Sequence, residues 1–224
     1  MVEAGIAFGV MNAIGLVAFA AVGALKGSDA GLDLFGVAVL GFLTALGGGT
    51  IRDLLVGRIP TSLQSNTEVL FAAAGIALAV ALATRVEVDE SRKLSSANQN
   101  ASRSGDGDLM ESPAVLLPDA VGLAAFAATG AAVGIEAGLS PFGVVVTATL
   151  TGVGGGSLSD LLLARIPAVL REDFYATPAV AGGAVAPPAV AAGLSVGATT
   201  LFAAGVVFGL RLGALRYGWR LPTV

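Results

Sequence analysis

The chain contains the stretch TALGGGTIRDLLVGRIP at residues 44–60 and a second version, TGVGGGSLSDLLLARIP, at residues 151–167. The two versions are separated by 107 residues. At the same offset, 28 of the 49 positions in 12–60 are identical to their counterparts in 119–167, without a gap. A long match at a fixed offset indicates an internal duplication. We therefore expect two similarly folded repeats, and we call residues 107 positions apart equivalent.

The composition is that of an all-α integral membrane protein. Of 224 residues, 55% are hydrophobic and 12% are charged, whereas soluble domains contain about 25% charged residues. The net charge of −4 argues against nucleic acid as a partner. The chain has no Cys and no His, which excludes disulfides, thiolate chemistry, histidine acid–base catalysis and the usual zinc sites. We therefore expect no enzyme activity and no cofactor.

Several apolar runs approach the roughly 20 residues needed to cross a bilayer. Seven transmembrane helices are predicted, at about residues 4–25, 31–58, 67–84, 114–134, 138–164, 174–195 and 197–215. The predicted organisation is a first three-helix repeat at 1–84, a polar cytoplasmic loop at 85–112, a second three-helix repeat at 113–195, and a seventh helix with a short tail at 196–224.

The positive charges predict the orientation, because cytoplasmic loops carry an excess of Lys and Arg. With the N-terminus outside and the C-terminus in the cytoplasm, ten of the twelve Lys and Arg residues fall on the cytoplasmic side. Lys26 is expected to snorkel to that interface. The repeats begin three crossings apart, so the second inserts upside down relative to the first. The predicted location is the cell membrane, and inverted repeats with interrupted helices are typical of transport proteins.

The glycine triplets predict breaks in spans 2 and 5. Each glycine costs roughly 1 kcal/mol relative to Ala inside a helix, and unwound backbone is tolerated in a membrane where it lines a path. The hydroxyl and carboxylate that follow, Thr50 with Asp53 and Ser157 with Asp160, have the spacing of a capping box. The carboxylates are interpreted as helix caps, as oxygens offered to a passing cation, or as both.

Arg52 is the residue of these stretches that is most costly to bury in a membrane. An arginine inside a span usually faces the bundle interior and pairs with an acid or a carbonyl. It is a candidate gate, with a structural ion pair and lipid-headgroup binding as alternatives. Repeat two has Ser159 at the equivalent position. The candidate residues of the ion path are Gly47, Gly48, Gly49, Thr50, Asp53, Gly154, Gly155, Gly156, Ser157, Ser159 and Asp160.

The motif GGGTIRDLLVGRIP, repeated as GGGSLSDLLLARIP, resembles the prokaryotic branch of the trimeric intracellular cation (TRIC) channels, also known as the glycine transporter domain family. The resemblance implies a homotrimer with one pore per protomer, which conducts monovalent cations and favours potassium. It also implies that the kinked spans 2 and 5 line the pore near the glycines. As an integral membrane protein, the chain is expected to have membrane lipids as partners. Family members often keep Arg-Asp in the second repeat, where this chain has Ser159.

Two alternatives to a channel remain open at this point. The first is a secondary transporter of glycine or another small amino acid, because the N-terminus of a half-helix can bind a substrate carboxylate. The second is a membrane enzyme or a purely structural protein, for which the chain offers few reactive groups.

Overall fold

The computed structural model describes residues 5–96, 112–171 and 174–221, and for 85–96 it describes the backbone only. The helices in this part of the chain are α1 (Ile6–Asp29), α2 (Leu34–Leu55), α3 (Thr61–Gln64), α4 (Asn66–Ser96), α5 (Pro113–Glu136), α6 (Pro141–Leu162), α7 (Ala168–Arg171), α8 (Thr177–Ala191) and α9 (Val196–Tyr217).

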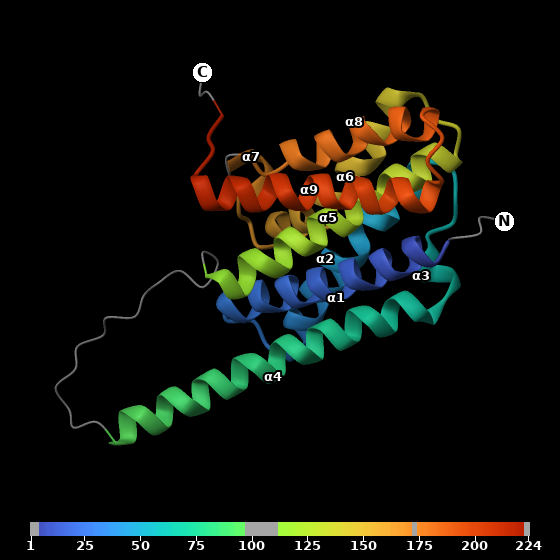
Figure 1. Cartoon of the computed structure of the whole chain (residues 1–224). Helices are drawn as coiled ribbons and strands as arrows, with labels where there is room; N and C mark the ends of the chain where they lie inside the picture. Colours follow the sequence, from blue (N-terminus) through green and yellow to red (C-terminus); the bar gives the residue numbers. More distant parts are fainter. Residues whose placement is uncertain (1–4, 97–111, 172–173, 222–224) are drawn as a thin grey trace.

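The duplication is confirmed by the helix boundaries. α1, α2 and α3 begin and end at residues equivalent to the first and last residues of α5, α6 and α7. α1 packs against α5, and the two helices run in opposite directions (Figure 1). α9 has no counterpart in the first repeat and packs mainly on α5 and α8.

Six helices, α1, α2, α4, α5, α6 and α9, are long and apolar enough to cross a bilayer. The span predicted at 174–195 is shorter than expected: α8 has 15 residues and runs through Pro187 and Pro188 before it ends at Ala191. Conversely, α4 continues past residue 84 to Ser96, and the rest of the predicted polar loop, 97–111, lies outside the described residues.

The breaks predicted at the glycine triplets are wrong, because α2 and α6 run through them as continuous helices. A methyl group at Gly48 would overlap the carbonyl oxygen of Thr151, and one at Gly155 would overlap the carbonyl oxygen of Thr44. The glycines therefore let the two helices cross at backbone contact, as small residues do at membrane helix interfaces. This packing offsets the low helix propensity of glycine.

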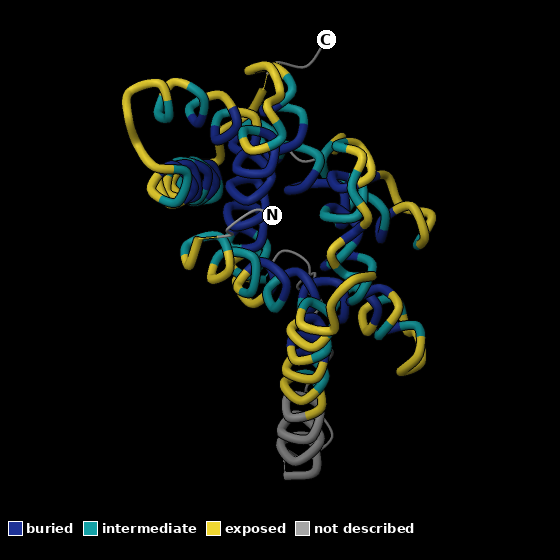
Figure 2. Tube along the Cα trace, turned by 90° about the vertical axis from the view of Figure 1, so that its right-hand side faces the viewer, coloured by how far each residue is buried: buried dark blue, intermediate teal, exposed yellow. Residues whose placement is uncertain are grey.

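The core is built jointly by the two repeats. α5 is buried along most of its length, and the exposed residues lie on the outer faces of the bundle (Figure 2). At the centre, the equivalent residues Phe19 and Phe126 make an edge-to-face contact with ring centroids 5.2 Å apart. Gly122 and Gly15 make room for these rings, because a methyl group at either would overlap the ring from the other repeat.

Candidate functional site

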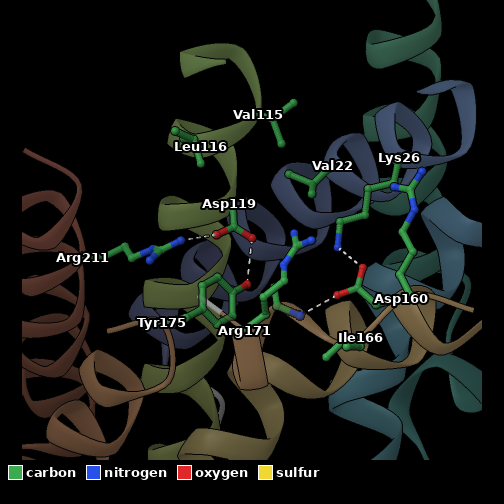
Figure 3. Close-up of a pocket in the computed structure, with 12 residues that line it drawn as sticks. Val22, Lys26, Val115, Leu116, Asp119, Asp160, Ile166, Arg171, Tyr175 and Arg211 are labelled. Carbon is green, nitrogen blue, oxygen red and sulfur yellow. Dashed lines mark hydrogen bonds and ion pairs between the residues drawn. The ribbon is translucent and has the colours of Figure 1, made fainter. Parts of the chain in front are cut away.

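Two polar cavities lie at opposite ends of the bundle. The first, here the Arg52 cavity, has a volume of about 430 Å³ and is lined by Phe8, Arg52, Asp53, Arg58, Ile59, Thr61, Gln64, Val133 and Glu136. The second, here the Lys26 cavity, has a volume of about 60 Å³ and is lined by Val22, Lys26, Val115, Leu116, Asp119, Asp160, Arg165, Ile166, Ala168, Arg171, Tyr175 and Arg211 (Figure 3).

The two cavities correspond to each other, because many of their lining residues are at equivalent positions of the two repeats. α1 places Phe8, near its start, in the Arg52 cavity and Lys26, near its end, in the Lys26 cavity. Residues of the two linings that are equivalent are Phe8 and Val115, Asp53 and Asp160, Arg58 and Arg165, Ile59 and Ile166, Thr61 and Ala168, Gln64 and Arg171, and Val133 and Lys26. The repeats are thus inverted relative to each other, and no described residue lines both cavities.

In the Arg52 cavity, Asp53 is bound by its neighbour in the sequence. Arg52 donates from Nε to Asp53 Oδ1 at 2.9 Å, and its Nη2 lies 2.8 Å from the same oxygen. Asp53 Oδ2 accepts from the backbone N–H of Thr61 at 3.1 Å, so the carboxylate caps α3. Both charged side chains are buried, at about 5% exposure. Of the alternatives for Arg52, the structure contains the ion pair with a carboxylate.

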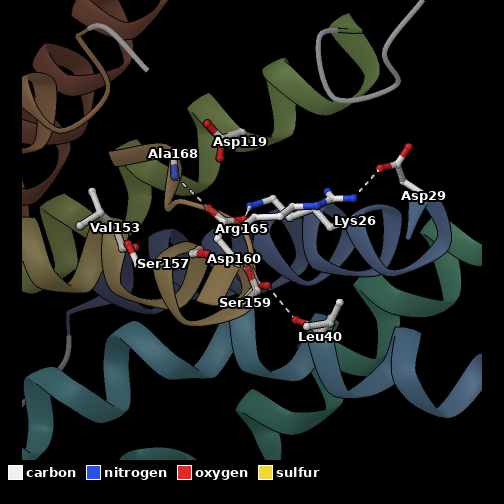
Figure 4. A network of polar contacts seen from close by, with 12 residues as sticks. Lys26, Asp29, Leu40, Asp119, Val153, Ser157, Ser159, Asp160, Arg165 and Ala168 are labelled. Atoms are coloured by element: carbon white, nitrogen blue, oxygen red, sulfur yellow. Dashed lines mark hydrogen bonds and ion pairs between the residues drawn. The ribbon is translucent and has the colours of Figure 1, made fainter. Parts of the chain in front are cut away.

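In the Lys26 cavity, Asp160 makes the equivalent cap with a different cation. Its Oδ2 accepts from the backbone N–H of Ala168 at 2.9 Å, and its Oδ1 accepts from Lys26 Nζ at 2.6 Å (Figure 4). Lys26 belongs to the first repeat, so this ion pair joins the two repeats. The Lys26 side chain is 14% exposed. Its predicted snorkelling to the interface is therefore wrong, because a buried carboxylate lies within its reach.

The predicted capping boxes are also wrong, since neither hydroxyl is at a helix start. Thr50 donates from Oγ1 to the carbonyl of Leu46 at 2.8 Å, and Ser157 donates from Oγ to the carbonyl of Val153 at 2.9 Å. Both hydroxyls thus bond the preceding helical turn inside a continuous helix. Ser159 is fully buried and donates to the carbonyl of Gly156 at 2.8 Å.

The six candidate glycines fall into two groups. Gly47, Gly48, Gly154 and Gly155 are buried in the crossing of α2 and α6. Gly49 and Gly156 are half-buried beside the polar residues. A methyl group would lie 3.7 Å from Arg52 Nη2 at Gly49 and 4.0 Å from the Tyr175 hydroxyl at Gly156, both ordinary contact distances. The crossing separates residues near one cavity from residues near the other.

A second pair of polar contacts, missed in the sequence, follows the same symmetry. Asn12 Nδ2 donates to Glu68 Oε1 at 2.8 Å, and at the equivalent positions the Tyr175 hydroxyl donates to Asp119 Oδ1 at 2.8 Å. The offset of 107 residues relates both pairs, and extending the repeat alignment past residue 60 identifies them. The contact is retained although the side chains, and the direction of donation, have changed.

Arg211 of α9 joins the pair at the Lys26 cavity. Its Nη2 lies 3.6 Å from Asp119 Oδ2, and its guanidinium lies over the Tyr175 ring, 4.5 Å from the centroid (Figure 3). Arg211 is 2% exposed. The repeat alignment cannot predict this residue, because α9 stands outside the duplication.

These features define a helical membrane protein built from two inverted repeats with a polar cavity at each end. The family model for the glycine transporter matches residues 9–85 and 116–188, and the chain belongs to this family. Relatives are named as membrane proteins of the UPF0126 group. One from Deinococcus radiodurans is 42% identical over 78% of this chain and 73% of its own. The inner membrane protein YadS of Escherichia coli is 34% identical over 95% and 94%.

The solved structures that match the chain are ion channels rather than enzymes. A structure described as the basis for conductance through TRIC cation channels is 32% identical, with a TM-score of 0.77 over 97% of both chains. The TRIC orthologue from Rhodobacter sphaeroides is 29% identical, with a TM-score of 0.77 over 96% of this chain and all of its own. The resemblance seen in the glycine motifs is thereby confirmed.

Proposed function

We propose that the protein is a homotrimeric potassium channel with one pore in each protomer. The observation that carries this proposal is the likeness to solved TRIC cation channels, with a TM-score of 0.77 over 97% of both chains. Proteins that share a fold can differ in function, so the residues of the path must support the same chemistry. A buried aspartate paired with a cation of the protein lies at each end of the bundle.

The proposed path runs from one cavity to the other along α2 and α6. Asp53 and Asp160 give each cavity a buried carboxylate, which Arg52 and Lys26 neutralise in this structure. Either carboxylate can attract a permeant cation once its partner moves away. The path must open at the crossing of α2 and α6, where the glycines present no side chains. The two backbones are in contact there, with the side chains of Leu158 and Ile51 packed beside the glycines, so opening requires the helices to move apart. Arg52 neutralises Asp53 in this structure, so its displacement would restore a free carboxylate to the path.

The proposed orientation places the N-terminus outside and the C-terminus in the cytoplasm, with α8 as a short seventh crossing. Four cationic residues line the Lys26 cavity, Lys26, Arg165, Arg171 and Arg211, and two line the Arg52 cavity, Arg52 and Arg58. Excess positive charge is typical of the cytoplasmic side. The Lys26 cavity would then be the inner mouth, and the Arg52 cavity the outer mouth, of a channel in the cell membrane.

Purified protein in sealed liposomes tests this proposal. With an outward potassium gradient and a proton-coupled dye, we expect passive potassium efflux that rises without saturation as the gradient increases. The variant Gly155→Leu should abolish the efflux, whereas Gly156→Ala, a change at the adjacent and roomier glycine, should retain it. Labelled glycine is supplied to the same preparation.

Saturable glycine uptake together with potassium efflux no faster than from protein-free liposomes would overturn the channel proposal. Chemical cross-linking of the reconstituted protein tests the trimer in the same sample. A ladder that ends at three subunits is expected, and a ladder that ends at two would contradict this part of the proposal.

A further inference from the structure

Glu68 is a second acid beside the ion pair of Arg52 and Asp53. Its side chain is half-buried in the first turn of α4, and its Oε1 accepts from Asn12 Nδ2 of α1. The charges of Arg52 and Asp53 both act on the Glu68 carboxylate. No described Lys or Arg nitrogen lies within 4.0 Å of Glu68. Glu68 is therefore bound by an amide and is not neutralised by a cation in this structure.

The packing of α4 on α2 brings Glu68 to the level of the Arg52 guanidinium. The two helices are antiparallel neighbours, and a methyl group at Gly41 of α2 would overlap Ile76 of α4. Equal steps in opposite directions from these facing residues lead to Gly49 in α2 and to Glu68 in α4. A methyl group at Gly49 would lie 3.7 Å from Arg52 Nη2. The guanidinium is therefore at the depth of Glu68 in the bundle.

Arg52 also lies on the face of α2 that contacts α4. It follows Gly41 by eleven residues, which is about three turns of an α-helix, so both residues are on the same face. Asp53 Oδ1 contacts Nε and Nη2 of Arg52, and a guanidinium carries five N–H donors. The side chain thus has α4 beside it and donors that Asp53 does not use.

The corresponding acid at the other end of the bundle has a cation beside it. The hydrogen-bonded pair of Tyr175 and Asp119 is equivalent to the pair of Glu68 and Asn12, and Arg211 Nη2 lies 3.6 Å from Asp119 Oδ2. Arg211 belongs to α9, which has no counterpart in the first repeat. Glu68 therefore lacks the cation that Asp119 has.

We propose that Glu68 is the second acceptor of Arg52. When the path opens, the guanidinium turns from Asp53 to Glu68 and leaves Asp53 free for a permeant cation. A buried guanidinium is costly without a carboxylate, and Glu68 removes this cost from the open state. Two carboxylates and one guanidinium need one further monovalent cation for neutrality, so a potassium ion at Asp53 favours Arg52 at Glu68. Glu68 is thus a positioning residue, and the inference rests on the proposed function in taking Asp53 as part of the path.

Nitrogen NMR of the arginine side chains follows the guanidinium without any ion flux. Full-length protein with isotope-labelled arginine is studied in detergent while potassium chloride replaces N-methyl-D-glucamine chloride at constant ionic strength. The Arg52 Nε–H signal is assigned by its absence from Arg52→Lys. It should move with potassium in the parent and stay in place in Glu68→Gln, which keeps an oxygen for Asn12 but has no charge. A signal that ignores potassium in the parent, or that moves equally in Glu68→Gln, would overturn the inference.

Potassium efflux from liposomes tests the consequence for the path. Glu68→Gln should lower the efflux at least about ten-fold, because a buried guanidinium with a single acceptor stays on it. In Arg52→Gln, Asp53 is already free, so adding Glu68→Gln should have little further effect. A purely structural role of Glu68 would lower the efflux by the same factor in both backgrounds, and this result would overturn the inference.

The chain offers a matched control at the same cavity. Glu136 lines the Arg52 cavity, and the cation that acts on its carboxylate is Arg58. Glu136→Gln also exchanges one acid for its amide, and it should change the efflux far less than Glu68→Gln does. Equal losses from the two variants would show a general effect of negative charge at this end and would refute a special role of Glu68.

The two measurements separate this inference from the proposed function. If the Arg52 signal responds as expected but the parent passes no potassium, Glu68 stands as the second acceptor and the channel proposal fails. If the parent passes potassium but its Arg52 signal is the same with and without potassium, the channel proposal stands and the exchange of acceptors is refuted.

Discussion

The Arg52 cavity and the Lys26 cavity are built from equivalent residues, yet their buried aspartates are neutralised in different ways. Asp53 pairs with Arg52 of the same helix, whereas Asp160 pairs with Lys26 of the other repeat. Ser159 stands at the position equivalent to Arg52, and Val133 at the position equivalent to Lys26. Neither aspartate therefore has the cation that the other one uses. A cation from the same helix leaves the mouth of a cavity unbridged, and a cation from the other repeat draws the two repeats together. The duplication has thus retained the aspartate cap while changing the cation that neutralises it.

Removal of Lys26 should have the largest effect on stability. Lys26→Val gives this position the residue found in the second repeat and leaves Asp160 buried without its cation. Losing one partner of a buried ion pair costs about 3–5 kcal/mol of the free energy of unfolding. Unfolding in detergent measures the loss, and Arg216→Gln, at an exposed site, should change stability by less than about 0.5 kcal/mol.

A double variant sharpens the comparison by giving the second repeat the charge pattern of the first. Lys26→Val with Ser159→Arg places an arginine next to Asp160, as Arg52 stands next to Asp53. The double variant should recover at least about half of the stability lost by Lys26→Val, because the carboxylate regains an adjacent cation. A double variant no more stable than the single one would show that the two cavities are not interchangeable in this way.

Gly→Ala substitutions where α2 crosses α6 should lower the stability of the protein by similar amounts in both repeats. Gly48→Ala or Gly155→Ala places a methyl group against a backbone carbonyl of the facing helix. Overpacking of this kind costs about 1–3 kcal/mol. Gly49→Ala and Gly156→Ala have room for the methyl group and should be neutral or stabilising by up to about 1 kcal/mol. Thermal unfolding of the four variants checks this contrast, which equal losses at all four positions would refute.

The smallest effect is expected at the pair formed by Tyr175 and Asp119. Tyr175→Phe removes the hydroxyl that donates to Asp119 Oδ1 and should cost about 1–2 kcal/mol, because a buried acceptor loses a donor. At the equivalent pair, Glu68→Gln keeps an oxygen that can accept from Asn12, so it should cost less than about 0.5 kcal/mol. A loss at Glu68→Gln that matches the loss at Tyr175→Phe would contradict the correspondence of the two pairs.

The repeated motif and the composition predict the helical membrane fold, the duplication and the family. They predict the importance of the glycines but not their structural role, since propensity alone favours a break at Gly47–Gly49. The low helix propensity of these glycines is offset by the backbone contact with α6, which depends on tertiary structure. The partner of Asp160 was equally hidden, because Lys26 lies 134 positions away in the sequence. Alignment of the repeats gives a clue to this partner, because Ser159 aligns with Arg52 and Val133 aligns with Lys26.

The central claim is that both cavities belong to one cation path. Phe8→Cys and Val115→Cys place single thiols at equivalent positions of the Arg52 and Lys26 cavities, and Phe142→Cys places one on the exposed surface as a control. Potassium efflux from liposomes is measured before and after each thiol reacts with a bulky methanethiosulfonate. The account predicts that modification at either cavity stops the efflux and that modification at residue 142 does not. Efflux that continues after the thiol at residue 8 or at residue 115 has reacted would contradict it.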